Sequence, residues 1–173
     1  MMHDRIEKRI PEHMIRVDRI LNHPEFQTSM RLIRILEKER IFCCHGMEHL
    51  LDVARIAYIA NLEEGLRLKK DVVYAAGLLH DVGKYLQYQH GTPHHVTSAE
   101  IGQKILDDAG YEKDEQERIV QAIFNHRDAK ALEGDDLSRI LYQADKLSRA
   151  CYACEASNEC NWSEEKKTPG VIA

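Results

Sequence analysis

The chain has 173 residues, with 24 Lys or Arg and 29 Asp or Glu, which gives a formal net charge of −5 at pH 7. This length is typical of one domain, so we expect a single unit over residues 1–173 whose core needs no disulfide. The acidic balance offers little electrostatic attraction to nucleic acid, which argues against duplex DNA or RNA as the main partner.

Membrane insertion and secretion are not expected. No run approaches the ~20 apolar residues that cross a bilayer, and the charged start MMHDRIEKRI has no apolar signal-peptide core. The five cysteines do not resemble a secreted disulfide framework, so we expect a cytoplasmic protein. The ten histidines are the first indication of metal or acid–base chemistry.

Apolar residues recur at helical spacing and strand-like alternation is nearly absent, which predicts an all-α bundle of about seven helices. The first three expected helices cover residues 12–21, 24–40 and 46–64. A fourth, over 71–81, is apolar nearly all round, and such helices are usually central and buried.

Residues 82–96 are expected to form a loop, because glycine and proline punctuate them. The next helix is expected to begin at Thr97, where a T-x-x-E capping box reaches Glu100, and to end at Gly110. The last two expected helices cover residues 114–126 and 136–151, and the tail beyond is weakly patterned.

Candidate metal ligands lie on three of the apolar helices. His80 and Asp81 end the fourth helix, where His80 alone could simply cap the last carbonyls. His49 lies within the third helix, and Asp145 lies beside the apolar face of the last. A carboxylate near a core is costly unless it is paired or binds a metal, so we expect these four residues to share a divalent cation. Mixed imidazole and carboxylate ligation suits Mn, Fe, Co, Ni or Zn better than Ca or Mg.

The order His49, His80-Asp81, Asp145 resembles the H…HD…D signature of HD-domain phosphohydrolases. The flanking sequences LLHDVGK at 78–84 and ADKL at 144–147 are also similar to that family. The resemblance covers about residues 44–151 and leaves 152–173 as a C-terminal tail. It implies an all-α HD-type fold, a bound divalent metal and hydrolysis of a phosphate ester or anhydride.

Two-metal members of this family carry further histidines between HD and the final Asp. The resemblance implies that His95 and His126 bind a second ion, with Asp81 bridging the two ions. Without it, His95 would be a loop histidine and His126 a helix C-terminal histidine favoured by the macrodipole. One or two ions are both compatible with the sequence.

The sequence around HD also bears on the substrate. It has neither the G-Y-P element of cyclic-dinucleotide members nor the acidic residues of alarmone members, and Gly83-Lys84 stand after HD instead. Gly-Lys at this place resembles dinucleoside-polyphosphate hydrolases and phosphodiesterases, which implies a small, nucleotide-like phosphorylated substrate. The alternative is a non-catalytic HD domain that binds a nucleotide or a protein partner as a sensor.

Asp81 and Lys84 are the expected catalytic residues, because Lys84 would place a positive charge against the phosphate. Outside this context Lys84 would be an ordinary solvated lysine. His45 lies one turn before His49 on the same helical face and, like Arg127 and Arg149, is a candidate substrate-binding residue.

Three late cysteines, Cys151, Cys154 and Cys160, follow a C-x2-C-x5-C spacing. They could hold zinc or an iron–sulfur cluster if Cys43, Cys44 or a histidine supplied a fourth ligand. The alternative is free thiols. We expect no part for them in hydrolysis, because six residues separate Cys151 from Asp145, which is ~9 Å along a helix.

Overall fold

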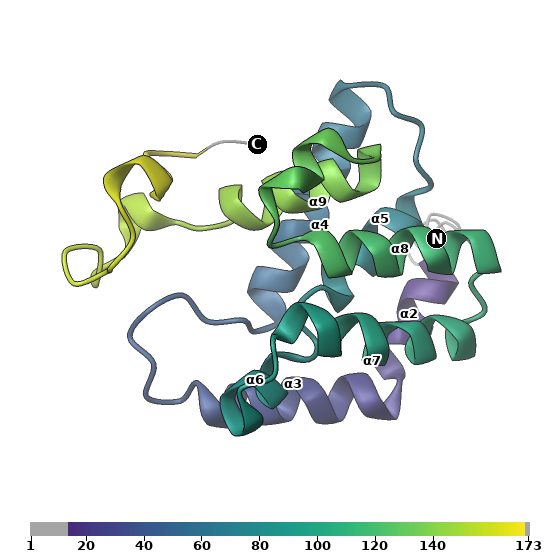
Figure 1. The fold of residues 1–173 in the computed structure, drawn as a ribbon, viewed down its shortest axis with the longest axis horizontal. Helices are drawn as coiled ribbons and strands as arrows, with labels where there is room; N and C mark the ends of the chain where they lie inside the picture. The colour runs from purple at the N-terminus through teal and green to yellow at the C-terminus, as the bar shows by residue number, and fades with distance from the viewer. Residues whose placement is uncertain (1–13, 172–173) are drawn as a thin grey trace, which may run out of the picture.

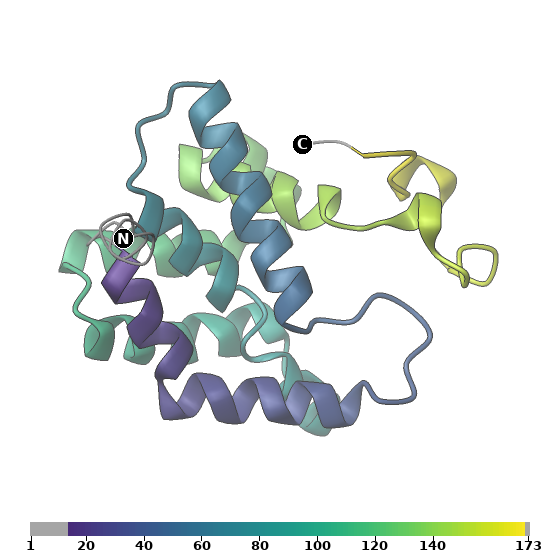
Figure 2. The same ribbon diagram turned by 180° about the vertical axis from the view of Figure 1, so that it is seen from behind.

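The computed structural model describes residues 14–171, and helices joined by loops make up this range without any strand (Figures 1 and 2). The all-α class predicted from the sequence is therefore confirmed. The first described helices are α2 (Ile15–Asn22) and α3 (Pro24–Leu36). Pro24 occupies the first turn of α3, as predicted, but α3 ends four residues before Arg40. The start of the predicted helix at residue 12 lies outside the described residues.

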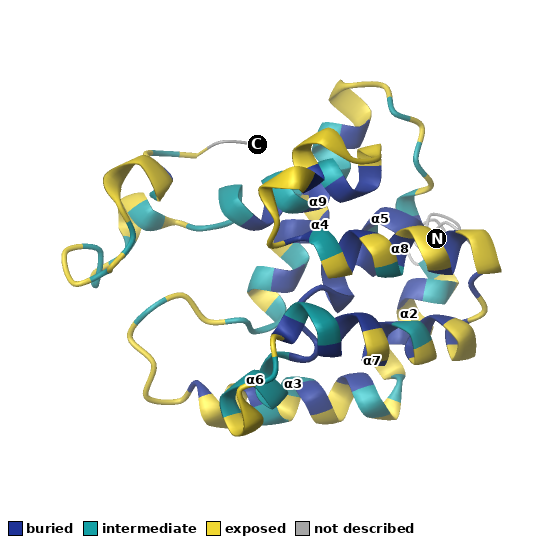
Figure 3. Cartoon of the chain, in the orientation of Figure 1, coloured by how far each residue is buried: buried dark blue, intermediate teal, exposed yellow. Residues whose placement is uncertain are grey.

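Helices α4 (Met47–Glu63) and α5 (Lys70–Leu79) pack against each other at the centre of the molecule. Every residue from Asp71 to Leu79 except Tyr74 is buried, which confirms the predicted central position of this segment (Figure 3). Gly77 allows the close approach, because a Cβ there would lie 2.6 Å from the Cα of Ala54. Helix α5 ends at Leu79, so His80 caps it and Asp81 lies in the following turn.

The segment expected to be a loop contains a short helix instead. Helix α6 (Lys84–His90) lies between Gly83 and Gly91, and Gly91 adopts a left-handed φ of 74° that ends it. Because these glycines stand at the ends of α6 and not inside it, they do not prevent a helix between them.

Helix α7 (His94–Ala109) begins three residues earlier than expected, and Gly110 ends it with a φ of 84°. The expected capping box does not form, because the Thr97 hydroxyl donates to the carbonyls of Gly83, at 3.1 Å, and His94, at 3.2 Å. The Ser98 hydroxyl accepts from the Gly83 N–H at 2.9 Å. The start of α7 is thereby fixed against the turn that carries Asp81.

Helices α8 (Lys113–Asn125) and α9 (Asp136–Leu147) complete the bundle, with the 3-10 turn Ala129–Glu133 between them. A capping box between Glu112 and Glu115 begins α8, one residue before the expected start. Helix α9 packs on α4 and α8. It ends four residues before Cys151, where the sequence had predicted a longer helix.

Two segments project from the bundle on the same side in both views: the loop between α3 and α4, and the chain beyond α9 (Figures 1 and 2). The latter contains the 3-10 turns Cys151–Ala153 and Glu164–Lys166. Within residues 14–171, no helix combines the length and the apolar character that crossing a bilayer requires.

Candidate metal centre

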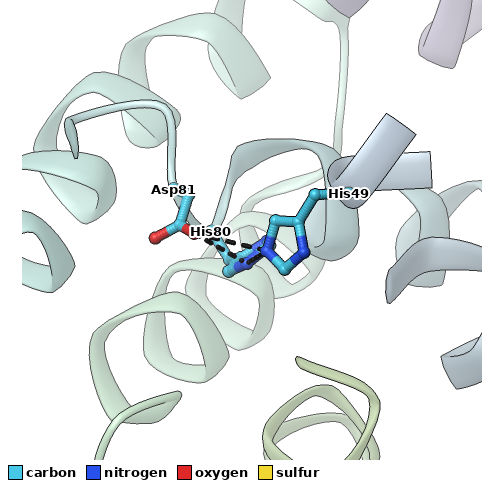
Figure 4. A group of neighbouring side chains, drawn as sticks. All are labelled: His49, His80 and Asp81. Carbon is cyan, nitrogen blue, oxygen red and sulfur yellow. Dashed lines mark hydrogen bonds and ion pairs between the residues drawn. The ribbon is translucent and has the colours of Figure 1, made fainter. Parts of the chain in front are cut away.

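Three neighbouring side chains form the first group of candidate ligands (Figure 4). His49 points inward from α4, and His80 and Asp81 follow the end of α5. The Nε2 atoms of the two histidines are 3.2 Å apart, and they lie 3.5 Å and 3.3 Å from Oδ2 of Asp81. Oδ1 of Asp145, from α9, lies 3.7 Å and 3.9 Å from the same two nitrogens. All four residues expected from the sequence therefore meet in one place.

A second group shares Asp81 with the first. Its other oxygen, Oδ1, faces Nε2 of His94 at 3.0 Å and Nε2 of His126 at 3.8 Å. The two nitrogens are 3.2 Å apart. Oδ1 of Asp81 is buried and has no hydrogen-bond partner among the described residues. The two carboxylate oxygens of Asp81 thus each face a separate pair of imidazoles.

His94, and not the expected His95, belongs to this second group. Successive side chains on a helix point about 100° apart, so only one of two adjacent residues can face the site. His95 instead lies with its ring 5.4 Å from the ring of Phe124. The shift follows from the true start of α7, since Ile105, Ile101 and His94 lie on one buried face of that helix.

The second nitrogen of each imidazole has a partner that orients the ring. Nδ1 of His80 lies 2.7 Å from the carbonyl of Gly77, and Nδ1 of His126 lies close to the carbonyl of Ile123. Nδ1 of His94 meets Oε1 of Gln87, and Nδ1 of His49 lies 3.3 Å from the hydroxyl of Ser148.

Carbonyl and amide oxygens only accept hydrogen bonds, so they assign the proton to Nδ1 and leave a lone pair on Nε2. Histidine ligands of metals are oriented in this way. In their neutral form, His80, His94 and His126 therefore each direct an unprotonated Nε2 at the carboxylate oxygens. Spacings of ~3–4 Å between donors suit an ion at ~2.0–2.2 Å from each. The residues present thus fit divalent transition-metal ions.

The titration behaviour of the site agrees with this assignment. Burial lowers the pKa of His126 to about 3, and burial also lowers the pKa of His49 and His94. Burial acts in the same direction on His80, but the carboxylates of Asp81 and Asp145 outweigh it and raise the pKa of His80. Burial alone would raise the pKa of Asp81, but the neighbouring His80, His49 and His94 hold it well below its usual range. Burial thus favours the neutral form of three imidazoles, and the two carboxylates attract positive charge, either as a proton on His80 or as a bound cation.

The centre opens into a cleft of about 770 Å³. Asp81, His94, His126 and Asp145 lie at the cleft wall. Positively charged side chains from α6, α9, the α3–α4 loop, the turn after α8 and the C-terminal segment surround them: Arg40, Lys84, Arg127, Lys146, Arg149, Lys166 and Lys167. The cleft is thus suited to a ligand with several negative charges.

The residues expected to bind substrate all line this cleft. Lys84 Nζ lies 3.3 Å from Nδ1 of His94, and burial lowers the pKa of Lys84. Arg127 is exposed at the rim. Arg149 lies 3.7 Å from Oδ2 of Asp145 and 3.7 Å above the ring of Trp162.

His45 lies in the same cleft, and its Nε2 is 3.9 Å from Oδ2 of Asp81. The buried carboxylate of Glu37 accepts from Nδ1 and from the backbone N–H of His45, and from the hydroxyl of Tyr88 at 2.6 Å. Burial alone would raise the pKa of Glu37, but these hydrogen bonds lower it. Glu37, Tyr88 and Gln87 were not identified from the sequence, because nothing in its spacing shows which helix packs beside the site.

The arrangement of two imidazole–carboxylate groups about one shared aspartate, inside a helical bundle, defines a candidate dinuclear metal centre. Residues 46–150 match the HD domain family, so the chain belongs to that family, as its sequence motif predicted. The family is part of a superfamily of metal-dependent phosphohydrolases.

A protein of Clostridium beijerinckii described as uncharacterized is 46% identical over 154 residues, which cover 89% of this chain and 96% of that protein. Ribonuclease Y of Geobacter sulfurreducens is 32% identical, and that of Lawsonia intracellularis is 29% identical. Each match covers 74% of this chain but only 22% of the ribonuclease. No solved structure matches the chain significantly.

Proposed function

We propose that this protein is a metal-dependent phosphohydrolase that cleaves a phosphate ester or anhydride of a small, nucleotide-like substrate. A dinucleoside polyphosphate is the first substrate to test. The observation that carries the proposal is the position of Asp81, whose two oxygens face separate imidazole pairs at the wall of a positively charged cleft.

His49, His80, Asp81 and Asp145 would hold one ion, and Asp81, His94 and His126 a second. When bound, such ions supply a hydroxide nucleophile near neutral pH and neutralise charge on the phosphoryl oxygens. Lys84, Arg127 and Arg149 would bind the remaining phosphate oxygens, because positive charge is needed where negative charge develops during phosphoryl transfer.

The hydrogen-bonded pair of Glu37 and His45 would manage the leaving group. Glu37 fixes the His45 ring with Nε2 toward the cleft, where a protonated imidazole can donate to the departing oxygen. Glu37 acts here as a positioning residue, since the protein holds it behind His45.

The experiment is a substrate panel with metal-stripped protein reloaded separately with Mn, Fe, Co, Ni or Zn. The panel contains a dinucleoside polyphosphate, a nucleoside diphosphate, a cyclic dinucleotide and a short single-stranded RNA. We expect phosphate or nucleotide release from the dinucleoside polyphosphate, and none with the Asp81→Asn variant.

RNA is the second candidate substrate, because the ribonuclease Y relatives carry that activity in their name. Cleavage of the RNA without cleavage of the dinucleotide would favour it. Saturable binding of a nucleotide with no turnover under any metal would overturn the enzymatic proposal and favour the sensor alternative.

A further inference from the structure

Cysteines from two distant segments meet at the cleft. Cys43 comes from the loop between α3 and α4, whereas Cys151 and Cys160 come from the chain beyond α9, and all three line the cleft. These are the two segments that project on the same side in Figures 1 and 2. All of their thiols are free.

Tight turns fold the C-x2-C-x5-C segment into a compact loop. The N–H of Cys154 donates to the Cys151 carbonyl at 3.3 Å, and the N–H of Cys160 donates to the Ser157 carbonyl at 3.4 Å. Lys167 Nζ also donates to the Ser157 carbonyl, at 2.8 Å. Lys167 thus holds the loop that carries the three thiols from outside that loop.

The fourth thiol, that of Cys43, lines the same cleft as those of Cys151 and Cys160. Burial raises the pKa of the Cys43 thiol, Arg149 opposes the shift, and Cys151 and Cys154 add to it. The pKa of Lys167 is raised mainly by its hydrogen bond to Glu164, with smaller contributions from Cys160 and Cys151. Arg149 is therefore a cationic neighbour of Cys43, and Lys167 is one of Cys151 and Cys160.

One nitrogen of the Arg149 guanidinium lacks a partner, although the side chain pairs with Asp145 and lies over the Trp162 ring. Nη1 of Arg149 is buried and has no hydrogen-bond acceptor among the described residues. Thiolate or sulfide acceptors beside Cys43 would satisfy it. Metal-bound sulfur is stabilised by such hydrogen bonds, and they also set the reduction potential of clusters.

The spacing of the thiols distinguishes a cluster from a single zinc ion. Zinc binds sulfur at ~2.3 Å, so four ligands around it lie ~3.8 Å apart. Within residues 14–171, the groups whose donor atoms all lie within 4.8 Å of one another both contain Asp81 and contain no cysteine. No three of the four thiols are therefore as close together as the ligands of one zinc ion. A cluster separates its thiolates further, because several irons and sulfides lie between them.

We propose that Cys43, Cys151, Cys154 and Cys160 bind an iron–sulfur cluster at the mouth of the cleft. Each thiol would release its proton to solvent and form one S–Fe bond, which completes the four-cysteine ligation of common clusters. Arg149 and Lys167 would neutralise the negative charge of the ligated cluster. The cluster would join the α3–α4 loop to the C-terminal segment and so fix the rim of the cleft.

The test is anaerobic reconstitution of the full chain with ferric iron, inorganic sulfide and a thiol reductant, followed by removal of unbound reagents. Acid-labile sulfide is the decisive measurement, because the histidine centre can also bind iron but does not bind sulfide. We expect bound sulfide and iron–sulfur charge-transfer absorption in the wild-type protein. Cys43→Ser and Cys154→Ser, from separate segments, should each lose both signals while helical circular dichroism is unchanged.

Cys44→Ser is the matched control, because Cys44 is exposed, adjacent to Cys43 and hydrogen-bonded to the Phe42 carbonyl at 3.5 Å. It should retain the wild-type sulfide content. Asp81→Asn should retain it as well, which separates this proposal from the phosphohydrolase proposal. Zinc at the cysteines, iron without sulfide, or equal sulfide in the Cys43→Ser and Cys44→Ser variants would overturn the proposal.

Discussion

Asp81 is the residue on which both donor groups depend. It is buried at the wall of the cleft, yet the imidazoles around it hold its pKa well below the usual range, so it remains a carboxylate. Because each of its oxygens faces a different imidazole pair, no other described side chain can replace it in both groups. Neighbouring residues such as Lys84 contact the cleft without being able to ligate a cation.

Lys84→Ala should lower kcat/KM about 10²-fold or more while metal content stays at the wild-type level. Under the proposed function the variant removes a positive charge that faces the substrate phosphate, and such contacts are worth ~3–4 kcal/mol in a water-excluded site. Metal analysis and kinetics on one preparation check this expectation.

Two further variants delimit the role of Lys84. Asp81→Asn should lose metal and activity together, and Lys84→Arg should recover only part of the rate, because a planar guanidinium does not reproduce a compact ammonium. Metal loss in Lys84→Ala would show that the lysine holds His94 and the loop. Unchanged turnover would show that another cation, such as Arg127 or Arg149, binds the phosphate.

His94→Ala and His95→Ala form a matched pair of adjacent substitutions. The Nε2 atom of His94 lies 3.0 Å from Asp81, whereas the ring of His95 packs against Phe124. After reloading with metal, we expect His94→Ala to have lost about one bound ion per chain relative to wild type. The metal content of His95→Ala should equal that of wild type. The reverse pattern of metal content would contradict the second donor group.

The choice between these histidines shows where sequence reasoning reached its limit. His49, His80, Asp81 and Asp145 were identifiable because each interrupts an apolar helical pattern. Within the cluster of histidines at 90–95, in contrast, the choice depends on the first residue of a helix. Ile105 and Ile101 lie on the buried face of α7, and two helical turns before Ile101 the same face carries His94. This spacing pointed to His94, but a helix assumed to begin at Thr97 did not include it.

At the scale of elements, an ion-pair network joins α2, α5 and α8 on the side away from the cleft. Arg16 donates to Asp71 at 2.7 Å and contacts the Glu115 carboxylate, and Lys69 lies 2.7 Å from Glu115. The Arg16 guanidinium also lies 4.1 Å from the centre of the Tyr111 ring. These contacts fix α2 on the bundle, to which it otherwise contributes few buried side chains.

Glu115→Gln should lower the free energy of unfolding at pH 7 by about 2–3 kcal/mol. The cost of breaking a buried pair is ~3–5 kcal/mol, and the value here is smaller because 21% of the Arg16 side chain is exposed. Glutamine keeps the capping box, so the change isolates the charge. Urea unfolding checks the value, with the exposed Glu117→Gln on the same helix as a control expected within ~0.5 kcal/mol of wild type.

The same pair predicts a pH dependence. Burial alone would raise the pKa of Glu115, but Arg16 and Lys69 lower it from 4.5 to about 2. A lowered pKa in the folded state means that the stabilisation is complete above pH 4.5 and is lost as the pH falls toward about 2. The difference between wild type and Glu115→Gln should therefore be smaller at pH 3 than at pH 7. A constant difference would contradict this assignment.

Element boundaries show which local signals were sufficient. Gly110 and Pro24 determined a helix end and a helix start correctly, because both act through the backbone alone. Helix α6 was missed, because its residues pack onto α3 and α7 and its formation depends on those contacts. The ends at Leu36 and Leu147 also depend on tertiary structure, since the chain leaves the bundle there to form the two sides of the cleft.

At the scale of the whole molecule, charge is distributed unevenly. The chain has a net charge of −5, yet seven Lys or Arg side chains line one cleft. Positive charge in a concave site concentrates the field and attracts anions selectively, even when the whole protein is acidic. The α3–α4 loop and the C-terminal segment supply several of these charges. The positive cleft could therefore not be predicted from the sequence patterns of the helices alone.

The attraction should make catalysis sensitive to ionic strength. The Debye length falls from ~30 Å at 0.01 M salt to ~10 Å at 0.1 M, so added salt should raise KM for a polyanionic nucleotide more than it lowers kcat. Arg127→Gln should raise KM at low salt and reduce the salt dependence, because Arg127 lies exposed at the rim. Arg55→Gln is the control, since Arg55 is 60% exposed on α4 and does not line the cleft. Steady-state kinetics across this salt range decide the matter: if both variants keep the wild-type salt dependence, attraction by the cleft is not what brings the substrate to the metal centre.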